Sequence, residues 1–145
     1  MPSAGCIFCQ IACGEAPCAR VFEDERTLAF MDIQPLSRGH LLVIPKQHAE
    51  NLFEISAEDL TAVAMTSHRV APVLRRVLEP EGLRVIQLNG AAAGQTVFHY
   101  HSHLLPKNAD EPDPATLLLH HRKRGDLEEL EALAARLRTE IARSA

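Results

Sequence analysis

Short apolar runs separated by turn residues predict a sheet in the first two thirds of the chain. The segments 19–23 and 27–31 contain β-prone residues and flank a polar turn, which indicates a hairpin. The run 40–45 is apolar over most of its length, which predicts a central strand buried on both faces. Two further strands are expected over 83–88 and 98–105.

Helical spacing of apolar residues appears in two places. Ser56 begins a capping-box pattern, so a helix is expected to start at Ala57 and to end before Glu79. Pro72 lies inside it and predicts a kink or a restart, because an interior proline removes one backbone hydrogen bond. A second helix is expected over 126–141, and core packing is favoured over a partner helix for its apolar stripe: Leu127, Leu130, Leu133, Ala134, Leu137 and Ile141.

These elements predict an α+β fold with a five-stranded, mostly antiparallel sheet, one main helix and a C-terminal helix. The length of 145 residues is that of a single domain, so one domain is expected over 1–145. Hydrophobic residues make up 46% and charged residues 23%, which is typical of an ordinary globular protein. No apolar run approaches the roughly 20 residues of a membrane helix, and the start lacks a signal-peptide pattern, so a cytoplasmic protein without membrane contact is expected.

The net charge of −4 argues against nucleic acid as a partner, since it offers no general attraction to phosphate polymers. Any nucleotide must therefore be bound by a local site. The basic cluster over 120–124 is short and isolated, and it is expected to be a solvated surface rather than a nucleic-acid-binding arm.

Three histidines at alternate positions are the most informative feature of the sequence. If 98–105 is a strand, His99, His101 and His103 point to the same face. Such a set could form a zinc site or a polar strand surface. The preceding segment 94–97 offers backbone amides, an amide side chain and a hydroxyl, which are neutral donors suited to phosphate oxygens. We therefore favour phosphoryl transfer, in which a neutral imidazole attacks phosphorus and forms a phosphoramidate that water cleaves.

Four cysteines lie within the first 18 residues, and Cys6 and Cys9 form a Cys-x-x-Cys hook. By itself the hook could be a redox pair or half of a zinc site. Clustered thiols without a secretion signal favour a metal, and zinc would need two more ligands.

Three segments, 28–35, 39–48 and 94–106, together resemble the histidine triad, or HIT, family in content and order. The resemblance covers about 6–106 and leaves 107–145 as a C-terminal extension. It implies a HIT-like fold and a catalytic histidine cluster. In the cluster His101 would be the nucleophile, His103 would contact the phosphate, His99 would lie behind the nucleophile and His40 would complete the set.

The resemblance also implies a purine nucleotide site. Asp32 would accept hydrogen bonds from ribose hydroxyls, Asn89 would lie beside the phosphates, and Gln95 and Thr96 would lie near the α-phosphate and leaving group. Three apolar residues would surround the base, although plain core packing is an open alternative for them: Phe8, Phe30 and Ile33.

Some bacterial-type members that this chain resembles bind a zinc ion with such a hook and two histidines. By resemblance its ligands here would be Cys6, Cys9, His48 and His99 in a closed tetrahedral site. The resemblance also implies a homodimer that pairs through the helix from Ala57 and the strand after Gly82.

The resulting expectation is a hydrolase or transferase that cleaves a nucleoside phosphoramidate or dinucleoside polyphosphate at the α-phosphate. The intermediate would be a nucleoside monophosphate bonded to His101. The main alternative is a purine nucleotide-binding sensor or scaffold without turnover. A third, a hydrolase with zinc on the triad histidines, would need an open metal site.

Overall fold

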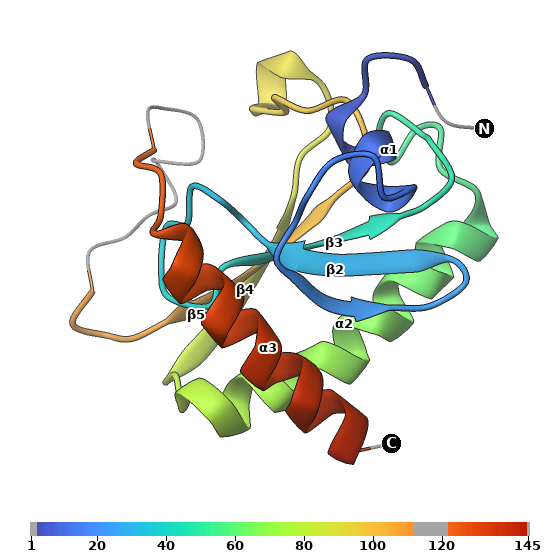
Figure 1. The fold of residues 1–145 in the computed structure, drawn as a ribbon. Helices are drawn as coiled ribbons and strands as arrows, with labels where there is room; N and C mark the ends of the chain where they lie inside the picture. Colours follow the sequence, from blue (N-terminus) through green and yellow to red (C-terminus); the bar gives the residue numbers. More distant parts are fainter. Residues whose placement is uncertain (1–2, 112–121, 145) are drawn as a thin grey trace.

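The computed structural model describes residues 3–111 and 122–144. Five strands form one antiparallel sheet in the order β1-β2-β3-β5-β4, as Figure 1 shows. The strands are β1 Arg20–Glu23, β2 Thr27–Met31, β3 Leu41–Pro45, β4 Gly82–Gln87 and β5 Ser102–Lys107. The helices are α1 Ile7–Ala12, α2 Ala57–Leu78 and α3 Leu127–Arg143, with a 3₁₀ turn at Ala91–Ala93. The predicted α+β fold, with a five-stranded, mostly antiparallel sheet, one main helix and a C-terminal helix, is confirmed.

The two faces of the sheet bury different clusters. Ala29 and Met31 of β2 belong to the larger cluster, which includes apolar residues of α2 and α3. The alternate residues Leu28 and Phe30 point the other way, because successive strand side chains alternate between faces. They pack with Phe8 of α1 in a smaller cluster. One face is therefore covered by two long helices, and the other by the short α1 and the segments that follow β3 and precede β5 (Figure 1).

Helix α2 begins where the capping pattern predicts. The Ser56 Oγ accepts the Asp59 backbone N–H at 3.1 Å, which satisfies one of the free amides of the first turn. The helix continues through Pro72 as one element, so the predicted restart there is wrong. Proline costs one backbone hydrogen bond, but Val70 and Val73 on either side of it are 0% and 1% exposed, and this packing holds the helix together.

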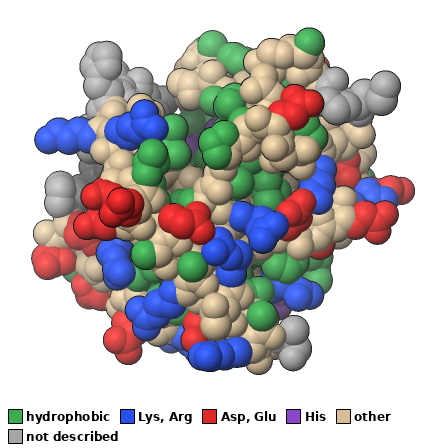
Figure 2. All heavy atoms as spheres, viewed as in Figure 1, with side chains coloured by type: hydrophobic (Ala, Val, Ile, Leu, Met, Phe, Trp, Pro, Cys, Tyr) green, Lys and Arg blue, Asp and Glu red, His purple; other side chains and the backbone are tan. Residues whose placement is uncertain are grey.

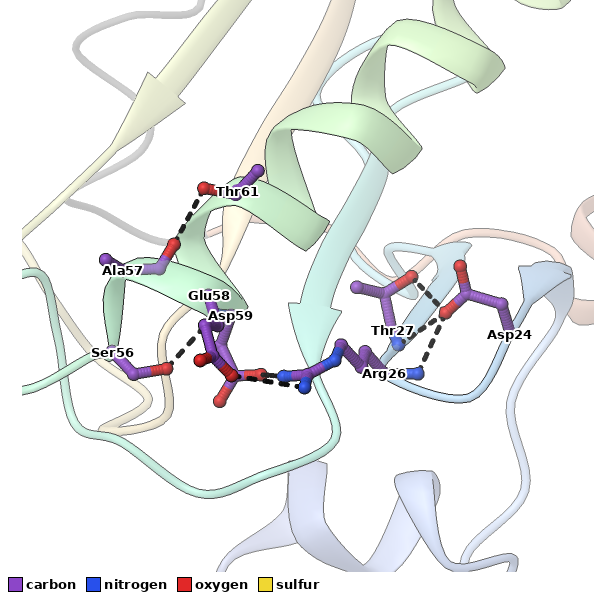
Figure 3. Close-up of polar contacts among 8 residues, drawn as sticks. All are labelled: Asp24, Arg26, Thr27, Ser56, Ala57, Glu58, Asp59 and Thr61. Atoms are coloured by element: carbon purple, nitrogen blue, oxygen red, sulfur yellow. Dashed lines mark hydrogen bonds and ion pairs between the residues drawn. The ribbon is translucent and has the colours of Figure 1, made fainter.

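The first hairpin is tied to the start of α2 by the polar contacts drawn in Figure 3. Asp24 Oδ1 accepts the backbone N–H groups of Arg26 and Thr27, which closes the turn between β1 and β2. The Arg26 guanidinium then pairs with Asp59 at 3.0 Å and with Glu58 at 3.2 Å. Both carboxylates also lie in the first turn of α2, where negative charge is favourable.

Helix α3 packs against the same core as α2, as the apolar stripe predicts. Leu130, Leu133, Ala134, Leu137 and Ile141 are buried in the larger cluster, and Asp126 caps the helix by accepting the Glu128 backbone N–H at 2.9 Å. Leu127 is the exception, at 50% exposed. Of the helices in the part of the chain that the structure describes, none combines the length and the apolar character that crossing a membrane requires.

The strand predicted over 98–105 starts later, at Ser102. The Tyr100 backbone N–H donates to the carbonyl of Ala49, at 2.7 Å, and not to a neighbouring strand. His99 and His101 therefore lie in a bent segment before β5, and His103 lies within the strand. The turn chemistry that bends this segment has no local sequence signature, whereas its apolar alternation resembles a strand.

The packing of α3 predicts that the C-terminal extension contributes to the stability of the whole chain. Leu137 is 0% exposed, so Leu137→Ala is expected to lower the free energy of unfolding by about 2–5 kcal/mol in urea titrations followed by circular dichroism. Leu127→Ala is the matched control and should change it by less than about 1 kcal/mol. Equal stability of the two variants, or separate unfolding of α3, would contradict this packing.

Candidate active site

A cavity of about 520 Å³ lies on the face of the sheet that α1 covers. Phe30, Leu42 and His103 are neighbours across β2, β3 and β5, so they line up on this face. The cavity combines apolar walls with a few polar groups, which is typical of a small-molecule site. Its polar lining includes Asp32, Thr96, His101, His103 and Arg122. In Figure 2 a hollow in the upper part of the molecule has hydrophobic side chains on both walls and a histidine at depth.

The proton on His101 is placed by a backbone carbonyl. The Nδ1 atom of His101 lies 2.7 Å from the carbonyl oxygen of His99. A carbonyl only accepts, so Nδ1 carries the proton and donates it. In the neutral ring the other nitrogen, Nε2, then has a free lone pair. His101 lines the cavity, so the arrangement supplies a nucleophilic nitrogen there.

A chain of two hydrogen bonds places the proton of His103 on Nε2, the opposite ring nitrogen to that of His101. The backbone N–H of Leu36 donates to Nδ1 of His40 at 3.1 Å, so the proton of His40 is on Nε2. That Nε2 lies 2.9 Å from Nδ1 of His103, which must therefore accept. Neutral His103 consequently carries its proton on Nε2, where it can donate to an anionic oxygen. The two rings thus differ at Nε2, which has a lone pair in His101 and carries the proton in His103. Their centroids are 5.0 Å apart.

Burial keeps these imidazoles neutral. It lowers the pKa of His40 to about 4, with Asp32 acting in the opposite direction, and it lowers the pKa of His103 to about 2, helped by the nearby His101 and His40. Burial also lowers the pKa of His101, against the hydrogen bond to the His99 carbonyl. A charged imidazole is disfavoured because water is excluded from the ring. The cavity therefore presents neutral nitrogens, one with a lone pair and one with a donor.

Asp32 is held by groups from three parts of the chain. Its Oδ1 accepts the backbone N–H of Gln34 at 2.8 Å, and its Oδ2 lies 3.4 Å from Nε2 of His40. Oδ2 also pairs with the guanidinium of Arg122 at 3.1 Å. The solvated surface predicted over 120–124 is thus wrong for Arg122, because an acidic side chain within the cavity binds it. Lys123 and Arg124 are exposed, as expected, and 120–121 lie outside the described residues.

Two of the polar residues expected near the phosphates hold loops in place. The Gln95 side chain donates to the carbonyl of Glu50 and accepts the Gly90 backbone N–H at 2.7 Å. The Asn89 side chain accepts the Leu52 backbone N–H at 2.7 Å. Neither side chain lines the cavity, whereas Thr96 does. The first two therefore shape the loop beside the histidines.

The three apolar residues expected around a base all line the cavity. Phe8 and Phe30 are 7% and 4% exposed and meet edge to face, with ring centroids 5.5 Å apart. Ile33 is 49% exposed at the rim, a position that core packing does not explain.

A cluster of two thiols and two imidazoles lies behind His101. The Nδ1 atom of His99 is 3.3 Å from Sγ of Cys6, and Nδ1 of His48 is 3.4 Å from Sγ of Cys9. The four potential ligand atoms all lie within 4.8 Å of one another. Tetrahedral zinc places its sulfur and nitrogen ligands about 3.5 Å apart, so these donors fit a zinc ion. The Nε2 of His99 bonds the carbonyl of Pro45 at 2.7 Å, which leaves its Nδ1 free to bind a metal.

Sequence reasoning missed two features of the site. The helix α1, which carries Cys9 and Phe8, has only 6 residues and no apolar periodicity that could reveal it. Arg122 lies in a sequence with no recognisable motif, and only its contact with Asp32, 90 positions away, marks it. No local signal in the chain identifies such a pair.

Comparison with known proteins agrees with this geometry. The adenosine 5'-monophosphoramidase hnt1 of Schizosaccharomyces pombe is 42% identical over 106 residues, which are 73% of this chain and 77% of that protein. A solved zinc-bound histidine triad family protein from Mycobacterium smegmatis is similar, with a TM-score of 0.81, 35% identity and coverage of 97% and 95% of the two chains.

A hypothetical histidine triad nucleotide-binding protein from Sulfolobus tokodaii has a TM-score of 0.84 at 34% identity, covering 95% of this chain and 93% of that one. The family model described as the HIT domain matches residues 13–110, which include the three triad histidines. The chain therefore belongs to the HIT domain family.

Proposed function

We propose that this protein transfers a nucleoside monophosphate from a phosphoramidate or a dinucleoside polyphosphate to water, with His101 as the nucleophile. The observation that carries the proposal is the 2.7 Å contact between Nδ1 of His101 and the His99 carbonyl, since it leaves Nε2 with a lone pair in the cavity. The phosphoramidase from S. pombe is a relative with a named activity of this class.

The reaction has two displacements at phosphorus. First, Nε2 of His101 bonds to the α-phosphorus while the bond to the leaving amine or phosphate breaks. The leaving group departs with that electron pair, and an amine takes up a proton from solvent water. A water oxygen then bonds to the same phosphorus and gives up a proton to solvent, the bond to Nε2 breaks with its electron pair returning to that nitrogen, and the free nucleoside monophosphate is released. The Nε2–H of His103 donates to a phosphate oxygen as charge develops, and Asp32 positions the ribose.

Removing the nucleophile is expected to abolish the chemistry and to spare binding. His101→Ala should lower kcat by at least about 10³-fold with adenosine phosphoramidate, while the affinity for adenosine 5'-monophosphate changes by much less. His68→Ala is the control, since His68 is exposed on α2. Quenched reactions with α-labelled substrate should place an acid-labile label on His101. Label on another residue, or turnover retained by His101→Ala, contradicts the mechanism, and binding without release of monophosphate by the wild type favours the sensor alternative.

We further propose that Cys6, Cys9, His48 and His99 hold a structural zinc ion. The donor set and its spacing support this, as does the zinc-bound relative from M. smegmatis. The metal would stabilise the attachment of α1 to the segment before β5, while four protein ligands would leave no position for substrate. The same residue, His99, offers its imidazole to the cluster and its carbonyl to His101.

Loss of the metal is expected to reduce stability more than turnover. Protein purified without chelators should contain one zinc per chain by elemental analysis, and Cys6→Ser should reduce both the zinc content and the Tm. Cys13→Ser is the matched control, because Cys13 is exposed and lies outside the cluster. Zinc-free wild-type protein, or equal metal content in the two variants, would refute the assignment.

We also propose that two copies pair through β4 and α2. Strand β4 is at the edge of the sheet, with β5 as its neighbour, and an edge strand offers free backbone groups for pairing. Val85 on β4 and Met65 on α2 are 61% and 62% exposed, so a second copy that pairs through these elements would cover apolar surface.

Sedimentation equilibrium at micromolar concentration is expected to give the mass of two chains. Val85→Lys should shift the equilibrium to one chain, because it places a charge in the contact. Glu25→Lys, in the turn at the opposite end of the sheet, should leave the dimer intact. A wild-type mass of one chain in this experiment would contradict the proposed dimer.

A further inference from the structure

The C-terminal segment forms a fixed wall of the cavity next to Asp32. The backbone N–H of Gly125 donates to the carbonyl of Ile33 at 2.7 Å, and a Cβ atom on Gly125 would lie only 3.0 Å from the ring of Pro35. This close packing holds the backbone at Gly125, three residues after Arg122, against the segment that follows Asp32. Figure 2 shows Lys and Arg side chains at the left of the hollow, on the side where Figure 1 places the start of α3.

The guanidinium of Arg122 has N–H groups that its hydrogen bond to Asp32 does not use. Its side chain is 15% exposed, and one nitrogen, Nη1, pairs with Oδ2 of Asp32. Within residues 3–111 and 122–144, no other acceptor for this guanidinium is found. A guanidinium has five N–H groups in a planar fork that matches the oxygens of a phosphate.

The charges around this end of the cavity leave an excess of one cation. Asp32 balances Arg122, and Glu131, the other acidic residue of the lining, is paired with Arg138 at 3.1 Å. Arg124 also lines the cavity and pairs with no carboxylate in the described part of the chain. Oδ2 of Asp32 also lies 3.4 Å from Nε2 of His40, so Asp32 contacts both Arg122 and the histidine cluster. Among the described residues, the two arginines are the cationic groups of the cavity lining, and Arg122 is the one that contacts Asp32.

We propose that Arg122 and Arg124 bind a phosphate group carried by the ribose, so that the site prefers nucleotides with a second phosphate on the 2' or 3' hydroxyl. This inference rests on the proposed function, in which the 5'-phosphate lies at His101 and the ribose at Asp32. A carboxylate beside a ribose accepts from a free hydroxyl, whereas an arginine there accommodates a phosphate, so Asp32 would bind one free hydroxyl and the arginines the phosphate on the other. The pair with Asp32 orients the fork of Arg122 before the ligand arrives.

The test is calorimetric titration with three ligands that share adenine and a 5'-phosphate. Adenosine 3',5'-bisphosphate or adenosine 2',5'-bisphosphate should bind wild-type protein about tenfold or more tightly than adenosine 5'-monophosphate, as expected of a charge-assisted contact. The comparison of the two bisphosphates identifies which hydroxyl carries the phosphate. Arg122→Gln and Arg124→Gln should each reduce this preference. Arg143→Gln, at the exposed far end of α3, should preserve it.

The outcomes separate this inference from the proposed function. If the monophosphate binds and neither bisphosphate binds more tightly, the inference is wrong and the nucleotide site stands. If Arg122→Gln weakens all three ligands equally, Arg122 contacts a group that they share, which also overturns the inference. If none of the three binds, the proposed function and the inference fall together. The wild-type comparison needs no variant, so an unstable Arg122→Gln protein does not prevent the test.

Discussion

Each buried imidazole in this cavity has one ring nitrogen committed to a neighbouring group, and the chemistry depends on that constraint. A backbone carbonyl holds the proton of His101 on Nδ1, while a backbone amide acts through His40 to hold that of His103 on Nε2. His101 and His103 thereby have opposite properties at Nε2: the first has a free lone pair there, and the second has an N–H donor. Burial lowers the pKa of each ring, so the neutral forms that these roles require persist near neutral pH.

The sheet supplies the burial by giving its two faces different covers. The long helices seal one face with a conventional core, which makes the strands a rigid base. The other face is covered by the short α1, and it leaves space over Phe30, Leu42 and His103. Rigid strands beneath a partly covered face hold side chains in place while keeping room for a ligand.

The strands and helices that depend on local periodicity could be predicted from the sequence, as in β2, β3, α2 and α3. The segment before β5 could not, because Tyr100 bonds a distant loop while its apolar alternation resembles a strand. Residue types alone left the Cys6 and Cys9 hook open between a redox pair and a zinc site, and only the resemblance to a family assigned His99 to the same cluster. Arg122 escaped prediction because its role is set by tertiary contact with Asp32, which leaves no mark on the neighbouring sequence.

The contacts that define the cavity join residues far apart along the chain. Cys6 and His99 are separated by 93 positions, and Asp32 and Arg122 by 90. Closing such long loops costs entropy that is recovered only when the intervening strands are in place, so we expect these contacts to form late in folding. A nascent or partly folded chain would then lack the assembled cavity. Ligand binding would accordingly report on completion of the fold, and a bound nucleotide would slow global opening more than local fraying.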